Sequence, residues 1–524
     1  MIFRSPLPDV EIPDVSLASF VLGNAKRFAD RPALINGVSG RVTTYAELER
    51  DVLRAASALA RRGLTKGDVV AIFSPNLPEW IVAFYAVATL GAIVTPVNPL
   101  YTIEEVAKQL KDAGAKFVVT IPQLLGAARE ASEGTRVEEL FVFGEAEGAT
   151  PFASLLGEDG EVPPVEIDPG EDIVALPYSS GTTGVCKGVM LTHRNLVANL
   201  CQIRASGHDL ANDTLVCVLP LFHIYGLVAI ANLALLSGAK TVMMPRFDFA
   251  QLLKVTQDYR VTFAHLVPPI ILALSKQPVV DEYDLSSLRT IFSGAAPLGP
   301  ELSRECEARL KVEVIQGYGM TEASPATHIT APGRGRAGSV GPCVPNMECK
   351  LVSVETGEEV LERGGRGEIC VRGPQVMKGY LNCPEATAQT VDAEGWLHTG
   401  DVAYVDDEGY FFIVDRAKEL IKYKAFQVAP AELEAVLLTH PSIADAAVVP
   451  SPDEEAGEVP KAFVVVRDGH GLTEVEVLSY VASHVAPHKK VRRVEFVSQV
   501  PKSPSGKILR RLLVARERER EASR

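Results

Sequence analysis

The chain has 524 residues, enough for a large core and at least two domains, and 47% of them are hydrophobic, as in ordinary globular proteins. Its formal net charge of −14 disfavours nucleic acids and anionic membranes as partners. The eight cysteines show no zinc-site spacing, no apolar run is long enough to span a membrane, and neither a signal-peptide pattern nor a C-terminal targeting tripeptide is visible. We therefore expect a cytoplasmic protein with free thiols and no membrane span.

Strand-like and helix-like segments alternate through the first 120 residues. The sequences TYAE at 44–47 and TIEE at 102–105 match the capping box, which satisfies the first N–H groups of a helix. Strands are predicted at 68–73, 92–95 and 116–120, and helices at 45–61, at 78–90 and after 102. This βαβα order predicts a parallel sheet with helices on both faces, and we expect Trp80, Phe84 and Tyr85 in its core.

An acidic connector precedes the most unusual stretch of the chain. Residues 144–172 contain nine acidic residues and neither Lys nor Arg, which is typical of a solvated linker. The sequence YSSGTTGVCKG at 178–188 follows, with three glycines, four Ser or Thr hydroxyls and one lysine. Glycines let backbone N–H groups turn toward an anion, so this loop predicts a polyphosphate ligand, with a plain surface turn as the alternative. It is not a Walker A loop, because Gly188 follows Lys187.

The alternation resumes after this loop and changes later in the chain. Further strands are predicted from 215, at 239–244, at 261–265 and at 288–292, with Gly-rich turns at 293–298 and 316–322. Ligands of open α/β sheets bind beyond the carboxyl ends of the strands, so we expect these turns and the 178–188 loop to face one crevice. From about residue 335, short strands and Gly turns predict a small β-rich subdomain, and the last hundred or so residues indicate a separate α+β unit.

Five motifs in a fixed order relate the chain to a known family. They are SSGTTGVCKG at 179–188, GYGMTE at 317–322, TGD at 399–401, DRAK at 415–418 and PKSPSGK at 501–507. Together they resemble the adenylate-forming superfamily of acyl-CoA synthetases, luciferases and peptide-synthetase adenylation domains, over nearly the whole chain. The stretches PLFHIY at 220–225, WLHT at 396–399, KELIKYK at 418–424 and FQVAPAELE at 426–434 are similar to 4-coumarate/cinnamate:CoA ligases of bacterial type.

The resemblance implies the domain organisation. It implies a large N-terminal ATP- and acyl-binding domain over residues 1–415 and a mobile C-terminal domain over residues 416–524, which swings about a hinge at Asp415 and Arg416. The expected fold class is α/β. Parallel αβ sheets and the small β-rich subdomain belong to the large domain, and the small domain is α+β.

The implied reaction is the ATP-dependent ligation of an aryl-propenoic acid, such as 4-coumarate or cinnamate, to coenzyme A. The carboxylate attacks the α-phosphate of ATP and releases pyrophosphate, and the thiol of coenzyme A then displaces AMP from the acyl-adenylate. ATP, Mg²⁺ and coenzyme A are the expected cofactor and co-substrates of a monomer or homodimer. The alternatives are a medium- or long-chain fatty acyl-CoA synthetase, a luciferase-like monooxygenase, a domain that loads a carrier protein, and a nucleotide sensor.

The resemblance also implies roles for individual residues. Lys507 is expected to reach the substrate carboxylate and the α-phosphate as a mobile positive charge. Glu322 is expected to hold Mg²⁺, Thr321 to donate to the α-phosphate, and His223 to gate the carboxylate and shield the adenylate. These four residues form the predicted catalytic set.

The resemblance also implies three binding sets. The residues expected around ATP and AMP are Ser179, Ser180, Gly181, Thr182, Thr183, Lys187, Gln316, Gly317, Tyr318, Thr321, Asp401, Arg416, Lys418, Lys422 and Lys507. Those expected to line the acyl pocket are His223, Tyr225, Ala229, Phe292, Ala295 and Gly319. Those expected near coenzyme A are Arg246, Lys424 and Ala425. In the acyl set, small residues between flat rings suit a planar acid.

Two departures from the family pattern carry expectations of their own. Val185 and Cys186 replace the usual Leu-Pro of the phosphate loop, which is expected to loosen the grip on phosphate. Ala425 replaces the Gly that lies beside the coenzyme A tunnel in the family. We expect its methyl group to weaken thioester formation and to leave adenylation largely intact.

Overall fold

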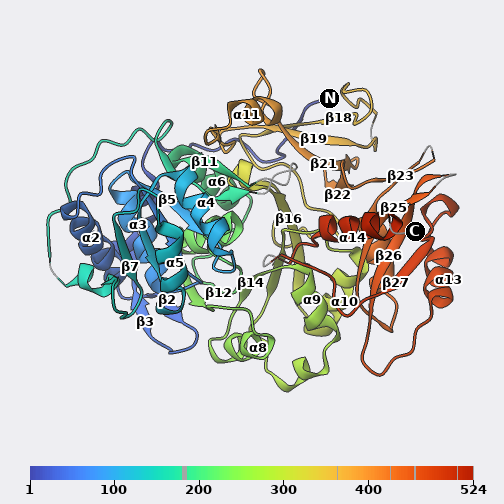
Figure 1. Cartoon of the computed structure of the whole chain (residues 1–524), viewed down its shortest axis with the longest axis horizontal. Helices are drawn as coiled ribbons and strands as arrows, with labels where there is room; N and C mark the ends of the chain where they lie inside the picture. The colour runs from blue at the N-terminus through green and yellow to red at the C-terminus, as the bar shows by residue number, and fades with distance from the viewer. Residues whose placement is uncertain are drawn as a thin grey trace.

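The computed structural model describes residues 1–157, 159–179, 186–362, 364–424, 426–453, 456–503 and 506–522 (Figure 1). Within these residues the strands form four sheets. Much of the N-terminal part of the chain, in blue, lies at one end of the molecule in Figure 1, and the C-terminal sheet, in red and orange, lies at the other. The predicted α/β class is confirmed.

The first large sheet has the predicted βαβα order. Its parallel neighbours are β5 (Ile93–Val97), β4 (Val69–Phe73), β6 (Ala115–Thr120) and β7 (Glu139–Val142). Its helices include α2 (Tyr45–Arg61), α3 (Pro78–Thr89) and α4 (Ile103–Ala113). Both capping boxes form, with Thr44 before α2 and Thr102 before α4, so the first N–H groups of these helices are satisfied locally. The aromatic side chains predicted for the core are fully buried on α3.

The second large sheet is mainly parallel. Its parallel strands, in spatial order, are β16 (Glu313–Gly319), β15 (Thr290–Ser293), β14 (Phe263–Leu266), β12 (Thr214–Cys217) and β13 (Lys240–Met243). β16 extends into the predicted Gly-rich turn at 316–322, because residues 317–319 pair antiparallel with β17 (Ala326–Ile329). The GYGMTE motif therefore forms a hairpin with a 3-10 turn at Thr321–Ala323, where the sequence predicted a Gly-rich turn directly after the strand.

The two smaller sheets lie in the second half of the chain. The predicted β-rich subdomain is an antiparallel sheet of β1 (Phe3–Arg4), β18 (Glu348–Val352), β19 (Gly367–Arg372), β21 (Leu397–Val405) and β22 (Phe411–Arg416). The C-terminal sheet contains β23 (Ile421–Tyr423), β24 (Phe426–Val428), β25 (Ile443–Asp453), β26 (Gly457–Val466) and β27 (Arg493–Phe496). Helices α12 (Pro430–Leu438), α13 (Glu474–His484) and α14 (Arg510–Ala522) accompany it.

The hydrophobic cores follow this division. One continuous core extends through much of the two large sheets and into the β-rich subdomain, whereas buried side chains of the C-terminal sheet form clusters of their own. A separate core is the property that defines a domain. Among the described residues, no helix combines the length and the apolar character needed to cross a membrane.

Candidate active site

A cavity of about 180 Å³ lies beyond the carboxyl ends of β14, β15 and β16. All the residues predicted for the acyl pocket line this single cavity: His223, Tyr225, Ala229, Phe292, Ala295 and Gly319. Tyr318 and Thr321 line it as well, so the predicted acyl and nucleotide residues meet there. The grouping follows from topology, because the carboxyl ends of parallel strands share one edge of the sheet.

Irregular backbone shapes one side of the cavity. Tyr225 begins a π-helical segment, η4 (Tyr225–Asn232), which continues into α7 (Leu233–Ser237). Such segments are rare and are often found at functional sites. A Cβ atom at Gly226 would lie 2.2 Å from the carbonyl oxygen of Pro220, so only glycine permits this close approach. Ala295 has a left-handed φ of 69°, an unusual conformation for a residue with a side chain.

Three histidines that the sequence did not predict, His208, His265 and His328, also line the cavity. His208 Nε2 is 3.1 Å from the carbonyl oxygen of Thr330, and because a carbonyl only accepts, this nitrogen carries the proton. Burial lowers the pKa of His208 to about 4, so the ring is neutral and its Nδ1 is an acceptor. His265 Nδ1 is 3.1 Å from the Tyr225 hydroxyl, and its Nε2 has no partner among the described residues. The cavity wall thus has polar positions beside Phe292.

His223 lies in the loop before η4 and contacts Phe222, with ring centroids 4.6 Å apart. Burial lowers the pKa of His223 to about 4, which leaves a neutral imidazole at pH 7. Its Nε2 is buried and has no hydrogen-bond partner within the described part of the chain. This ring can therefore turn or bond to an incoming ligand without breaking an existing bond at that nitrogen.

The predicted nucleotide residues Tyr318, Asp401 and Arg416 form one cluster. The Tyr318 hydroxyl donates to Asp401 Oδ2 over 2.6 Å, and Arg416 Nε lies 3.4 Å from Oδ1. Burial raises the pKa of the Asp401 carboxyl, and the charge of Arg416 opposes this shift. The register of β21 with β22 places Asp401 opposite Arg416, so two strands of the β-rich subdomain position the pair.

Lys507 reaches the same cluster from the C-terminal domain. Burial lowers the pKa of the Lys507 ammonium from 10.5 to about 8, Arg416 lowers it further, and Asp401 opposes the shift. The loop that carries Lys507 packs on the start of α9 (Pro268–Lys276), since a Cβ atom at Gly506 would lie 3.1 Å from Val267. Gly506 has a left-handed φ of 78°, which favours glycine at this contact.

The pKa of Lys507 gives a testable pH dependence. The ammonium is charged below pH 8 and loses its proton as the pH rises through about 8, so kcat/KM for ATP in the adenylation step is expected to fall on the alkaline side. Lys507→Arg keeps a positive charge at every accessible pH and is expected to abolish this alkaline decrease while lowering the rate. Pyrophosphate release measured from pH 6 to 10 checks this. An alkaline decrease that persists in Lys507→Arg would assign the titration to another group.

Glu322 forms a further cluster with Ser179 and Tyr380. Its buried carboxylate oxygen Oε1 accepts hydrogen bonds from Ser179 Oγ and from the Tyr380 hydroxyl, both over 2.9 Å. Lys187 Nζ lies 5.2 Å from the centre of the Tyr380 ring. One carboxylate beside a phosphate site is the usual protein contribution to Mg²⁺ binding, so these residues fit that ion. Tyr380 was not predicted, because a single Tyr outside every motif gives no sequence signal.

The other predicted site residues belong to none of the clusters described above. Gln316 is buried and donates to the carbonyl of Leu298 over 3.3 Å, and Gly317 lies against Phe292 at the end of β16. Arg246 and Lys418 are exposed in loops, and Lys422 and Lys424 lie on the exposed hairpin of β23 and β24, at the edge of the C-terminal sheet. The predicted residues Ser180, Gly181, Thr182, Thr183 and Ala425, and the unusual Val185, lie outside the described residues.

Comparison with known proteins agrees with this fold and cavity. The AMP-binding enzyme family matches residues 22–381, and the AMP-binding enzyme C-terminal domain matches residues 432–507. The chain therefore belongs to the AMP-binding enzymes, the adenylate-forming class to which the five motifs point.

Individual relatives and solved structures show which members of this family the chain resembles. The chain is 49% identical to 4-coumarate--CoA ligase 1 of Solanum tuberosum, over 98% of this chain and 96% of the relative. It is 48% identical to 4-coumarate--CoA ligase 2 of Nicotiana tabacum, over 98% and 97%. Among solved structures, the anthranilate CoA ligase AuaEII in complex with anthranoyl-AMP has a TM-score of 0.89 and 26% identity, over 97% of this chain and 98% of that one. A benzoate CoA ligase from Burkholderia xenovorans has a TM-score of 0.86 and 26% identity, over 95% and 99%.

Proposed function

We propose that this chain is an ATP-dependent acid–thiol ligase that joins an aryl-propenoic acid, 4-coumarate or a close relative, to coenzyme A. The observation that carries the proposal is a set of 4-coumarate–CoA ligases that are 46–49% identical to the chain over 98% of its length. These relatives support the predicted activity and disfavour the fatty acyl-CoA alternative. The flat rings of Tyr225 and Phe292 in the cavity wall suit a planar aryl group.

In the first step, an oxygen of the substrate carboxylate attacks the α-phosphorus of ATP, and pyrophosphate leaves. The protein contributes mainly position and charge. Tyr318 offers its ring to the adenine, and Asp401 offers carboxylate oxygens to the ribose hydroxyls. Lys507 supplies the positive charge between the carboxylate and the α-phosphate. The proximity of Lys507 to Asp401 and Arg416 supports this role. Thr321, at the cavity, donates to the α-phosphate.

Glu322 is the residue that we propose for Mg²⁺. The ion, when bound, neutralises the charge of the leaving pyrophosphate. The Ser179 and Tyr380 hydroxyls hold the carboxylate in place, and Lys187 adds a second positive charge on the same side. The predicted loop residues 180–183 complete this phosphate site in the proposal.

In the second step, the sulfur of coenzyme A attacks the acyl carbon, the bond to the AMP oxygen breaks, and AMP leaves. We propose that the C-terminal domain, from residue 416, rotates at Asp415 and Arg416 between the steps. Rotation would withdraw Lys507 and bring the β23–β24 hairpin with Lys422 and Lys424 toward the site, with Arg246 and Lys424 contacting coenzyme A. His223 would then shield the adenylate. A cytoplasmic location and a monomeric or homodimeric state remain predictions.

One assay tests the function. AMP release and loss of the coenzyme A thiol are measured with 4-coumarate, cinnamate and fatty acids, each with and without coenzyme A. Thiol loss with 4-coumarate or cinnamate and not with fatty acids is the expected result. AMP release without thiol loss would instead point to transfer to a carrier or to an oxidative second step, and thiol loss only with fatty acids would contradict the proposed substrate class.

The polar cavity wall adds a prediction about selectivity. His208 presents a neutral acceptor, which would pair with the ring hydroxyl of 4-coumarate and find no partner in cinnamate. His208→Leu is therefore expected to lower kcat/KM about tenfold for 4-coumarate and to change it little for cinnamate. Kinetics with both acids check this. An equal decrease for the two acids would show that His208 only supports the fold.

A further inference from the structure

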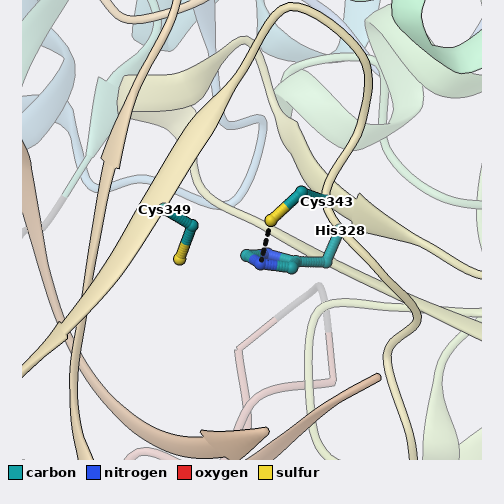
Figure 2. A group of neighbouring side chains, drawn as sticks. All are labelled: His328, Cys343 and Cys349. Atoms are coloured by element: carbon teal, nitrogen blue, oxygen red, sulfur yellow. Dashed lines mark hydrogen bonds between the residues drawn. The ribbon is translucent and has the colours of Figure 1, made fainter. Parts of the chain in front are cut away.

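Three metal-ligand side chains lie together outside the residues used in the proposed reaction. His328 is on β17, Cys349 is on β18, and Cys343 is in the segment between these strands (Figure 2). One ligand atom of each residue lies within 4.8 Å of the others, and all three residues are buried. The sequence spacing matches no known zinc motif, and only the fold brings the three residues together.

The geometry directs these groups toward one another. Cys343 Sγ lies 3.5 Å from His328 Nε2, the contact drawn as a dashed line in Figure 2, and a β-bridge between the two residues fixes their backbones. The other ring nitrogen, Nδ1, is 3.0 Å from the hydroxyl of Thr327. A hydrogen bond at the second nitrogen is the usual way in which a protein orients a metal-binding histidine. Thr327 therefore turns Nε2 toward the sulfur atoms.

We propose that His328, Cys343 and Cys349 bind a thiophilic divalent cation, with Zn²⁺ as the best match. Zinc prefers cysteine sulfur at about 2.3 Å and histidine nitrogen at about 2.0–2.1 Å, so the widest pair of ligand atoms has to close by only about 1 Å. Binding releases the two thiol protons to solvent. The two thiolates then balance the charge of the ion, because a buried charge is costly unless it is neutralised. Water from the acyl cavity, which His328 also lines, would supply the fourth ligand.

A second group of potential ligands shows why the first is preferred. Glu368, Cys370 and His398 also lie within 4.8 Å of one another. Here, however, His398 Nδ1 is 3.4 Å from Cys370 Sγ and 3.5 Å from Glu368, while Nε2 is 3.5 Å from Asp392. This group offers only one sulfur atom, its Glu368 and His398 are partly exposed, and Glu368 Oε1 already accepts a hydrogen bond from the N–H of Gly400 over 2.8 Å. A thiophilic ion therefore favours the first group, which is fully buried and has two sulfur atoms, and Cys370 serves as a matched control.

The bound ion would connect two parts of the large domain. β17 belongs to the second large sheet and β18 to the β-rich subdomain, so the ion would tie the cavity wall to that subdomain. A ligand that binds only the folded chain raises its stability by mass action. The proposal is independent of the ligase reaction.

The test uses the full-length, reduced, metal-free protein in a Cys186→Ser background, because Cys186 is an exposed thiol. Co²⁺ is titrated as a spectroscopic probe, and Tm is measured with and without Zn²⁺. We expect one Co²⁺ per chain with thiolate-to-Co²⁺ charge-transfer absorption, and an upward shift of Tm in Zn²⁺. Cys343→Ser and Cys349→Ser are each expected to lose both signals, whereas Cys370→Ser is expected to keep them.

Three results would overturn the proposal: no thiolate absorption in the parent, absorption that persists in both Cys343→Ser and Cys349→Ser, or absorption lost only in Cys370→Ser. Circular dichroism of the metal-free variants confirms that each is folded. If one serine variant does not fold, the other variant and the Tm shift of the parent still decide the question.

Discussion

Lys507→Ala is expected to lower the rate of adenylation by about 100- to 1,000-fold and to leave transfer from a supplied acyl-adenylate to coenzyme A nearly unchanged. The ammonium lies with Asp401 and Arg416, in the cluster that we propose for the nucleotide. Alanine removes the charge and leaves the backbone of the loop in place. Pyrophosphate release measures the first step, and thiol loss with synthetic coumaroyl-adenylate measures the second.

Lys502 provides the matched control for this prediction. It lies on the same loop, but its ammonium is paired with Asp445 of the C-terminal domain over 2.7 Å. Lys502→Ala is expected to change both steps by less than about threefold, because a partly exposed ion pair contributes little. If Lys507→Ala slows both steps equally, the domain rotation that we propose between them is contradicted.

Glu322→Gln is expected to slow pyrophosphate release by about 100-fold and to raise the Mg²⁺ concentration needed for half-maximal rate. The amide oxygen of glutamine still accepts the hydrogen bonds of Ser179 and Tyr380, so the local structure is retained while the negative charge is lost. A titration with Mg²⁺ at saturating ATP checks the prediction.

Tyr380→Phe distinguishes the effect of the charge of Glu322 on Mg²⁺ binding from the effect of the hydrogen bond that positions its carboxylate. This variant removes one hydrogen bond to the carboxylate and keeps its charge, so we expect a decrease of about tenfold or less and an unchanged Mg²⁺ dependence. An unaltered Mg²⁺ dependence in Glu322→Gln would show that this carboxylate does not hold the ion.

The sequence predicted much of the fold because its local signals were strong. The capping boxes before α2 and α4 and the apolar runs of β4 and β6 act over a few residues, and the structure has these elements within one or two residues of the predicted bounds. The extension of β16 was missed because it depends on pairing with β17, a partner that follows a turn. The π-helical form of η4 was missed because its apolar pattern predicts only a helix.

The candidate site was predictable where motifs mark it. The predicted acyl-pocket residues meet in one cavity, and Tyr318, Asp401, Arg416 and Lys507 form one cluster. His208, His265 and Tyr380 were not predicted, since each reaches the site through a single side chain outside any recognised motif. Their contributions depend on burial and on tautomer, which only the folded chain defines.

The packing of Gly506 on α9 has a consequence for experiments in concentrated salt. The contact joins Gly506 to the apolar side chains of Val267 and Pro269. Salt screens charges but does not weaken apolar contacts, and salting-out ions strengthen them. High ionic strength should therefore weaken the attraction of free ATP for the site without weakening the apolar contact that holds the Lys507 loop on α9. The choice of salt therefore distinguishes the binding of ATP from the packing of the Lys507 loop on α9.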